Sequence, residues 1–441
     1  MSAAQTRLRQ AIRHEVAVEL PQRVAAEVGA VDTGSIGEVR GTIARSIADS
    51  ALRTHTEAEL AAGRPPVEDG TAHRIVGDIV KEFIGAGGLQ RWLDDPTVET
   101  IAVNRWDDVV VHHADGRRVR VAPVASSNDE LTELVRDLAR SATHERRLDQ
   151  GSPALNLQLP GGQRLFAVLG LTSDGSTALT IRRHGYVTAT LHQLRRRGSV
   201  DIGLESFLSA LTRARKNVLI TGGTSAGKTT LLRAMAADID AAERLITIED
   251  TLELGLEHDP TRIDVIALQA RDANIEGEGA ISQAELLRWA LRMSPDRVIV
   301  GEIRGPEVIP MCNAMSQGND GSLATLHASS SGAAFARLAA YAAQGDERLP
   351  VEVTNLLVST GLHFVVHLAR TKDRASRVVS SIREVVAADG AHVVTNEVYR
   401  PGPDNRARPV AGSLHGATLD DLADVGFDPD MLENPMGWWT S

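Results

Sequence analysis

The sequence predicts an α/β protein in which a parallel-sheet domain follows a smaller α+β domain and a helical N-terminal segment. From about residue 203 onward, short apolar runs alternate with helical stretches, which is typical of a parallel sheet. A glycine-rich loop follows the first of these runs, and the region before it mixes helical spacing with two-residue alternation. We place the segments at 1–70, 71–186, 187–202, 203–400 and 401–441.

The composition bounds the class of protein. At 441 residues, with 42% hydrophobic and 24% charged residues, the chain is expected to hold two or three globular domains. The formal net charge of −11 argues against general coating of nucleic acid. A single cysteine, Cys312, excludes an internal disulfide and a cysteine-based zinc site. Because there is no apolar signal core and no apolar run near the ~20 residues of a membrane span, we expect a cytoplasmic protein attached to a membrane only through partners.

Residues 1 to about 65 are predicted to be helical. Ser35 and Glu38 form a capping-box pattern, and apolar residues recur at helical spacing over 36–47. The run Gly63-Arg64-Pro65-Pro66 cannot continue a helix, so it predicts the first domain boundary.

Residues 71–186 are predicted to form an α+β domain. Helical spacing covers 72–83, and Ser127 with Glu130 predicts the cap of a second helix. A turn at Pro160-Gly161-Gly162 suggests a hairpin. The strands expected in this domain are 99–103, 109–111, 155–159, 164–169 and 178–183.

Two segments are predicted to lie outside the folded domains. Residues 187–202, with Arg195-Arg196-Arg197, are interpreted as a solvated basic linker, with contact to acidic lipid or nucleic acid as the alternative. The tail from about 401 is rich in Pro, Gly, Asp and Asn and ends in Trp438-Trp439. We expect this tail to be loosely ordered or docked on a neighbour.

The remaining region is predicted to be the parallel sheet. Ser282 and Glu285 predict the cap of the helix before the fourth strand. Later apolar segments at 362–368 and 378–386 are interpreted as an antiparallel extension. The strands expected in the parallel part are 218–221, 245–248, 265–268, 298–301 and 323–326.

A phosphate-binding loop follows the first of these strands. Its sequence fits G-x-x-x-x-G-K-[ST], and a helical stretch begins directly after it at Thr230. We include Thr230 among the predicted nucleotide-binding residues. Glycines allow the backbone N–H groups and the helix N-terminus to face a polyphosphate. Lys228 would reach the β- and γ-phosphates, and the Thr229 hydroxyl would hold Mg²⁺. The loop consists of Gly222, Gly223, Thr224, Ser225, Ala226, Gly227, Lys228 and Thr229.

An acidic cluster ends the next strand. Glu249 and Asp250 follow an apolar run, and Glu253 comes shortly after. Because ligands bind at the carboxyl ends of parallel strands, these carboxylates are candidates to hold Mg²⁺ with Thr229, directly or through water. The alternative is a solvated helix start, where acidic residues are also favoured.

Two further clusters end later strands. A buried strand delivers Glu302 to the same edge, where a carboxylate can activate water. The alternative is an edge carboxylate in a salt bridge. Gly301 stands where an aspartate might have bound Mg²⁺. His327 ends the following strand and could sense the γ-phosphate, although a lone histidine is usually structural.

Taken in order, these elements resemble the type II/IV secretion-system ATPase family. The phosphate loop is followed by an aspartate box (248–254), a Walker B segment (291–304) and a histidine box (318–328). The resemblance covers about residues 75–385. The stretches that look most like the tight-adherence pilus branch, CpaF and TadA, are 89–104, 147–153, 159–164, 180–183, 274–277 and 291–297.

The resemblance implies a ring homohexamer of two-domain subunits, with ATP and Mg²⁺ held between the N-terminal domain and a RecA-like C-terminal domain. It implies that Arg164 and Arg182 or Arg183 contact phosphates, since a guanidinium pairs phosphate oxygens bidentately. A surface arginine on a hairpin is the alternative. The other residues implied in catalysis are Lys228, Glu249, Glu302 and His327.

The sequence also departs from the family pattern. Gly318-Asn319 stands where a Gly-His pair is usual, and the four-cysteine zinc motif of related pilus-extension and type II secretion ATPases is absent, so we expect no zinc.

The function expected is a motor that hydrolyses Mg-ATP to power pilus assembly or protein secretion at the cytoplasmic membrane, with inner-membrane platform proteins as partners. A DNA-transfer or nucleic-acid translocase ATPase is the alternative, weakened by the net charge and the 3% of aromatic residues. A nucleotide-gated scaffold that does not turn ATP over is a third possibility, against which Lys228, Glu302 and His327 argue.

Overall fold

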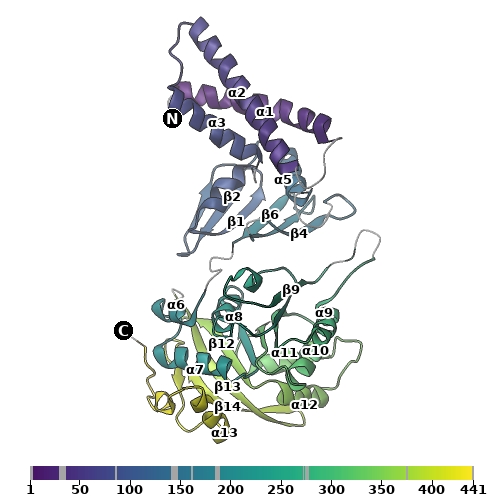
Figure 1. Cartoon of the computed structure of the whole chain (residues 1–441), viewed down its shortest axis with the longest axis vertical. Helices are drawn as coiled ribbons and strands as arrows, with labels where there is room; N and C mark the ends of the chain where they lie inside the picture. Colours follow the sequence, from purple (N-terminus) through teal and green to yellow (C-terminus); the bar gives the residue numbers. More distant parts are fainter. Residues whose placement is uncertain are drawn as a thin grey trace. The chain divides into compact units, whose positions relative to one another are not determined.

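The computed structural model describes residues 3–28, 36–84, 87–140, 148–159, 162–183, 189–271, 273, 278–373 and 376–439. The chain divides into two units, residues 1–185 and 186–441 (Figure 1). The first unit contains a helical bundle and an antiparallel sheet, and the second a largely parallel sheet covered by helices on both faces. The predicted fold class is therefore confirmed.

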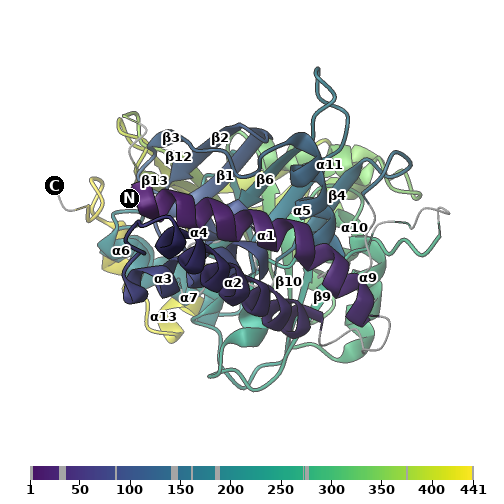
Figure 2. The same ribbon diagram turned by 90° about the horizontal axis from the view of Figure 1, so that it is seen from above.

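Three helices form the N-terminal bundle. They are α1 (Ala3–Val28), α2 (Ile36–Ala61) and α3 (Asp69–Ile84), and they lie against one another (Figures 1 and 2). Their apolar residues recur at helical spacing and form one core. The helix α3 was expected in the following domain, but its apolar face packs against α1 and α2. The break at 63–66 thus ends a helix without ending the core, and the predicted capping box at Ser35 lies outside the described residues.

The first unit also holds a six-stranded antiparallel sheet in the order β3-β2-β1-β6-β5-β4. Strand β3 was not predicted, because its residues are too exposed to give an apolar alternation. Alternate residues of the other strands pack with α5 (Asn128–Arg140), whose first turn is capped by Ser127 Oγ accepting from Glu130 N at 3.1 Å. The strands are β1 (Val98–Arg105), β2 (Asp108–His113), β3 (Arg118–Val121), β4 (Ala154–Gln158), β5 (Arg164–Val168) and β6 (Ala178–Arg182), and the short helices are η2 (Gly87–Leu89) and α4 (Gln90–Asp94).

The second unit is built on a nine-stranded sheet in the order β15-β14-β13-β12-β7-β11-β10-β8-β9. The six strands from β12 to β9 run parallel, and β12 to β15 pair antiparallel. The segments 362–368 and 378–386 were expected to add an antiparallel extension. The strands β12 and β13 do pair antiparallel, but the other edge of β12 pairs in parallel with β7. The strands are β7 (Val218–Gly222), β8 (Leu245–Glu249), β9 (Val265–Gln269), β10 (Arg297–Ile303), β11 (Leu323–His327), β12 (Phe364–Arg370), β13 (Arg377–Asp389), β14 (His392–Pro401) and β15 (Ala407–Pro409).

Helices cover both faces of this sheet. Along β7, Val218 and Ile220 enter the core under α6, α7, α8 and α13, whereas Leu219 enters the core under α9 to α12. The helix α9 begins with the predicted capping box of Ser282 and Glu285. The helices are α6 (Leu191–Arg196), α7 (Ile202–Arg213), α8 (Lys228–Ala236), η3 (Leu256–His258), α9 (Gln283–Ala290), η4 (Leu291–Met293), α10 (Val308–Ser316), α11 (Ala333–Ala342), α12 (Val351–Gly361), α13 (Gly416–Asp424) and η5 (Pro429–Leu432).

The prediction of a solvated linker at 187–202 is wrong from residue 189 on. A capping box formed by Thr190 and Gln193 starts α6, and Leu191 and Val200 are buried in the core beside α7. The apolar residues on either side of the tri-arginine run supply this buried face.

The tail is likewise not loosely ordered over the described residues up to 439. Phe427 packs edge to face on Phe207 of α7 with ring centroids 5.3 Å apart. The backbone N–H of Trp438 donates to the Asp201 carboxylate at 2.7 Å, and Trp439 Nε1 donates to Ala407 O at 2.8 Å. The tail therefore docks on its own chain, because its few apolar residues pack against α7 and are buried there.

Asn217, the residue before β7, connects the central strands at their amino ends. Its side chain is fully buried, and its Oδ1 accepts the N–H groups of Gly321 and Ser322 at 2.9 Å each. Its Nδ2 donates to Met315 O, Asp320 Oδ1 and Gly361 O at 2.7–3.0 Å. One amide thus joins β7 to the turns that precede β11 and β12.

Replacing Asn217 with alanine is expected to lower the free energy of unfolding by about 4 kcal/mol, because several buried backbone groups lose their partners. Urea unfolding of the full chain, followed by tryptophan fluorescence, measures the loss. The control is Asn319→Ala, which removes one hydrogen bond to Pro295 O and should cost about 1 kcal/mol. Equal losses for the two variants would contradict a special role of Asn217.

Candidate nucleotide site

The predicted phosphate loop joins β7 to α8. A Cβ atom on Gly222 would lie 2.8 Å from Leu368 O of β12, so only glycine lets the two backbones approach this closely. Gly227 has a φ of +98° and directly precedes α8. Because this residue has no side chain to cap the helix, the loop suits an anion held by backbone N–H groups. The predicted Mg²⁺ ligand Thr229 lies half-buried in the first turn of α8.

Lys228 extends back across the loop. It is 7% exposed, and its Nζ lies 3.5 Å from Gly222 O and 3.4 Å from Gly223 O. The same Nζ lies 3.2 Å from His327 Nε2 and 3.9 Å from Glu302 Oε1. Three residues that the sequence placed at the ends of three different strands or loops are therefore brought together at one point.

The Glu302 carboxylate is shared between two strands. It lies near the end of β10, and its Oε1 accepts from His327 Nε2 of the neighbouring β11 at 2.7 Å. Its Oε2 accepts from Arg304 Nε at 2.7 Å and Nη2 at 2.5 Å. Both readings of this residue, a site carboxylate and an edge salt bridge, thus describe one arrangement.

His327 lies between Lys228 and Glu302. Partial burial, and next the charge of Lys228, lower the pKa of this imidazole below its ordinary value. A neutral ring has one donor and one acceptor nitrogen. With its proton on Nε2 the ring donates to Glu302 Oε1, and its Nδ1, which lies 3.3 Å from Lys228 Nζ, accepts from the lysine. The histidine thus links the lysine to the carboxylate.

Glu249 points into the protein rather than towards the phosphate loop. It is 3% exposed, and its carboxylate accepts the N–H groups of Glu253 at 2.5 Å and Leu254 at 2.9 Å. A Cβ on Gly301 would lie 2.8 Å from Glu249 Cγ. The missing side chain of Gly301 therefore makes the space that Glu249 fills.

The other predicted magnesium ligands are also engaged. Asp250 Oδ2 accepts from Arg304 Nη1 at 2.8 Å. Over the described residues, no three His, Cys, Asp or Glu side chains are grouped to hold a metal ion. Since Mg²⁺ usually binds through one or two protein oxygens plus phosphates and water, Thr229 fits such an ion, whereas Glu249 fits it only through a rearrangement of its loop.

The three candidate arginines lie in the first unit. Arg164 of β5 and Arg182 of β6 are directly paired in the sheet. Like charges at facing positions repel, so this pair favours an anion nearby. Arg164 Nε also donates to Asn156 Oδ1 at 3.3 Å, and Arg183 donates to the backbone oxygen of Asp95. Their phosphate contacts remain predictions.

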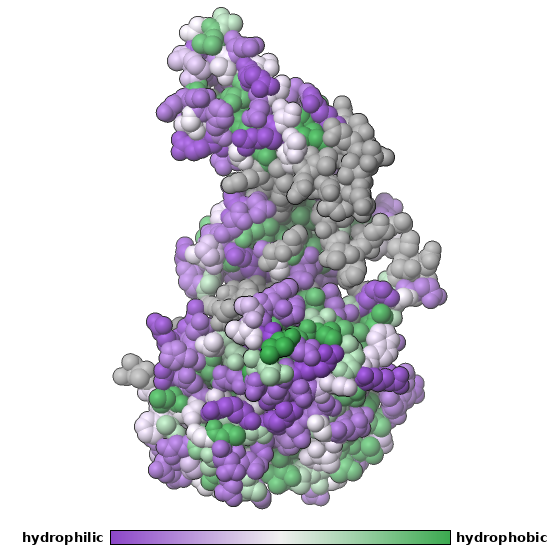
Figure 3. Space-filling view, viewed as in Figure 1, coloured by the Kyte–Doolittle hydropathy of each residue, from purple (hydrophilic) through white to green (hydrophobic). Residues whose placement is uncertain are grey.

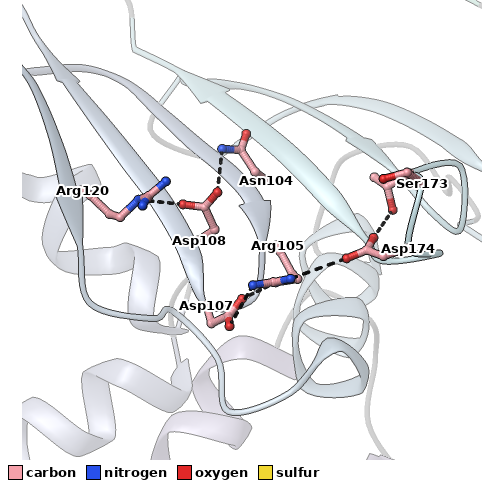
Figure 4. A pocket seen from close by; sticks show the side chains of 8 residues that line it. Asn104, Arg105, Asp107, Asp108, Arg120, Ser173 and Asp174 are labelled. Atoms are coloured by element: carbon pink, nitrogen blue, oxygen red, sulfur yellow. Dashed lines mark hydrogen bonds and ion pairs between the residues drawn. The ribbon is translucent and has the colours of Figure 1, made fainter.

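A separate hollow of about 380 Å³ lies in the first unit (Figure 4). Charged residues line it, but they pair with one another: Arg120 with Asp108 at 2.9 Å, and Arg105 with Asp107 and Asp174. None of the predicted site residues lines this hollow. Its charged side chains are thus already in ion pairs without a ligand.

Two residues near the loop were missed in the sequence. Arg304 was named only as the last residue of the Walker B segment. Its place two positions after Glu302, on the same side of an extended chain, could have indicated an ion pair with that carboxylate. His367 of β12 is 8% exposed and lies 2.9 Å from Thr221 Oγ1 through its Nδ1. Burial, with Lys228 nearby, lowers the pKa of His367 to about 4. A lone histidine in an apolar strand gave no signal for this contact.

A parallel sheet with a phosphate loop after a central strand, and a carboxylate and a histidine on the adjoining strands, defines a RecA-like phosphate-loop protein. The comparison with known families agrees: the chain belongs to the type II/IV secretion system protein family, which matches residues 92–404. The family prediction is confirmed, while the CpaF and TadA branch remains a prediction.

Relatives and solved structures extend this result. A Mycobacterium tuberculosis protein provisionally named as a conjugal transfer protein is 34% identical over 303 residues, which cover 67% of this chain and 83% of that protein. VirB11 of Rhizobium radiobacter is 32% identical over 315 residues, covering 65% of this chain and 89% of VirB11. The structure of the pilus retraction motor PilT with bound ADP is 20% identical with a TM-score of 0.50, covering 68% of this chain and 82% of PilT, and indicates a shared fold.

In the described part of the chain, no helix is both long enough and apolar enough to span a bilayer. On the face drawn in Figure 3, hydrophilic side chains predominate and hydrophobic ones form small groups between them.

Glu249 gives a pH-dependent test of this arrangement. Burial, reinforced by Glu253 and Glu257, raises the pKa of Glu249 to about 8 from an ordinary 4.5, although Arg233 lies nearby. A raised folded-state pKa gives stability that is present at low pH and is lost as pH rises towards 8. Between pH 5 and 8 we expect Glu249→Gln to gain on the order of 4 kcal/mol relative to the wild type.

Urea unfolding at a series of pH values measures this gain. The exposed Glu352 of α12 supplies the control, since Glu352→Gln should follow the wild-type curve. Parallel curves for Glu249→Gln and the wild type would contradict a buried, protonated Glu249.

Proposed function

We propose that this protein is a motor that hydrolyses Mg-ATP as a ring homohexamer and powers pilus assembly or protein secretion at the cytoplasmic membrane. The observation that carries the proposal is the meeting of Lys228, His327 and Glu302 at the phosphate loop, with contacts of 2.7–3.9 Å. Family membership supports it, as does the similarity to VirB11 of Rhizobium radiobacter.

The loop and its lysine bind the substrate. Backbone N–H groups of residues 222–229 surround the phosphates, and Lys228 turns from His327 towards the β- and γ-phosphates. Thr229 would hold Mg²⁺, with Asp250 and Glu253 acting through water, and the ion would neutralise charge on the phosphates. Arg164, Arg182 and Arg183 supply further phosphate contacts from the N-terminal domain.

Glu302 orients the attacking water and accepts its proton, and His327 keeps this carboxylate in place while it senses the γ-phosphate. Loss of the γ-phosphate removes one anchor of Lys228 and His327, which allows the N-terminal domain to move. This motion is the output passed to inner-membrane platform proteins. The tight-adherence pilus system is the proposed setting.

Glu302→Gln is expected to lower kcat by about a hundredfold or more, because the amide cannot accept the proton of water. Binding of a fluorescent ADP analogue should stay within about threefold, since ADP lacks the group that Glu302 serves. Phosphate release by the assembled protein is the measurement, and Glu352→Gln is the matched control. Unaltered turnover would remove Glu302 from the catalytic role.

A second candidate is an ATPase of DNA transfer, favoured by the relative named for conjugal transfer. If it holds, single-stranded DNA should raise ATPase activity, and the stimulation should vanish at high salt because phosphate contacts are ionic. The net charge of −11 leads us to expect no stimulation. An assembled protein with no steady-state turnover at all would instead indicate a nucleotide-gated scaffold.

A further inference from the structure

Arg304 joins the two acidic segments of the candidate site. It follows directly after β10, and its Nε and Nη2 both donate to Glu302 Oε2, at 2.7 and 2.5 Å. Its remaining terminal nitrogen, Nη1, donates to Asp250 Oδ2 at 2.8 Å. One planar guanidinium therefore bridges the Walker B segment and the aspartate box, which lie 54 residues apart in the chain.

The backbone of Arg304 is itself held in place. Glu307 is 6% exposed, and its Oε1 accepts the N–H group of Arg304 and, at 2.9 Å, that of Gly305. The turn after β10 is thus fixed by a buried carboxylate. Because the main chain is fixed on one side and two carboxylates bind the guanidinium on the other, the position of this side chain is well determined.

Arg304 completes the hydrogen bonding of Glu302. His327 and Lys228 approach Oε1, at 2.7 and 3.9 Å, whereas Arg304 contacts Oε2. A carboxylate held at both oxygens cannot rotate freely, whereas one held only at Oε1 can turn about its last torsion. The charge of Lys228 does not replace this contact, because its Nζ approaches Oε1 rather than Oε2.

We propose that Arg304 is a positioning residue that fixes the plane of the Glu302 carboxylate and links it to Asp250. The proposal rests on the proposed function, in which Glu302 orients water. An isolated exposed ion pair contributes little, and the Arg304 side chain is 47% exposed. The forked contact with two carboxylates distinguishes this residue from such a pair, since a network restrains both partners.

The experiment compares Arg304→Gln, Arg304→Lys, Asp250→Asn and the double variant Arg304→Gln/Asp250→Asn. Arg304→Gln is expected to lower kcat by roughly tenfold to a hundredfold, because a misaligned catalytic group costs rate. The KM for ATP and the affinity for ADP should stay within about threefold. Arg304→Lys should fall between wild type and Arg304→Gln, since an ammonium supports one carboxylate but cannot bridge two.

The double variant tests the link between the two acidic segments. If Asp250 acts through Arg304, Asp250→Asn lowers kcat, and the double variant is no slower than Arg304→Gln alone. Arg213→Gln, at an exposed arginine in the last turn of α7, is the matched control and should leave kcat unchanged.

The outcomes separate the two proposals. A wild-type chain without ATPase activity would overturn the proposed function. Turnover in the wild type together with an unchanged kcat in Arg304→Gln, or a loss confined to KM, would overturn the positioning role. Additive effects of Arg304→Gln and Asp250→Asn would overturn the link to Asp250. If Arg304→Gln does not fold, Arg304→Lys and Asp250→Asn replace it. A lowered kcat in both supports the positioning role, and an unchanged kcat in both overturns it.

Discussion

The register of the central strands is the constraint on which the rest of the second unit depends. Asn217 holds the amino end of β7 to the turns before β11 and β12 through five side-chain hydrogen bonds. At the other end of the same strands, Gly222 is paired with His327 and with Leu368. A slip of one residue would turn every side chain of a strand to the opposite face. The amide at one end therefore helps to set the distance between Lys228 and His327 at the other.

The candidate site is a chain of polar and charged side chains in contact with one another, built on this register. Lys228, His327, Glu302, Arg304 and Asp250 follow one another from the phosphate loop to the aspartate box. Each member contacts the next, so Asp250 is connected to the phosphate loop by a series of short polar contacts rather than by long-range attraction. Such a chain is suited to respond to a phosphate in the loop, because the Lys228 ammonium can contact either His327 or the anion.

The acidic residues of the aspartate box differ in burial and in their hydrogen-bond partners. Glu249 is buried and holds the backbone of its own loop, in the space that Gly301 provides. Asp250, the next residue, points to Arg304 and is partly exposed. Two adjacent carboxylates thus have different environments, and Glu249 is the buried one.

The sequence by itself determined the α/β class, the phosphate loop and the candidacy of Glu302 and His327, because these depend on short-range patterns: a strand, a glycine loop, a helix start, and a polar residue at a strand end. Only the tertiary structure decided that Glu249 points inward, that Arg304 bridges two segments, that β12 lies parallel to β7, that α3 packs with α1 and α2, and that the tail docks on α7. Each of these depends on contacts between residues far apart in the chain. Residue spacing records which face of an element is apolar, but it does not record which surface that face meets.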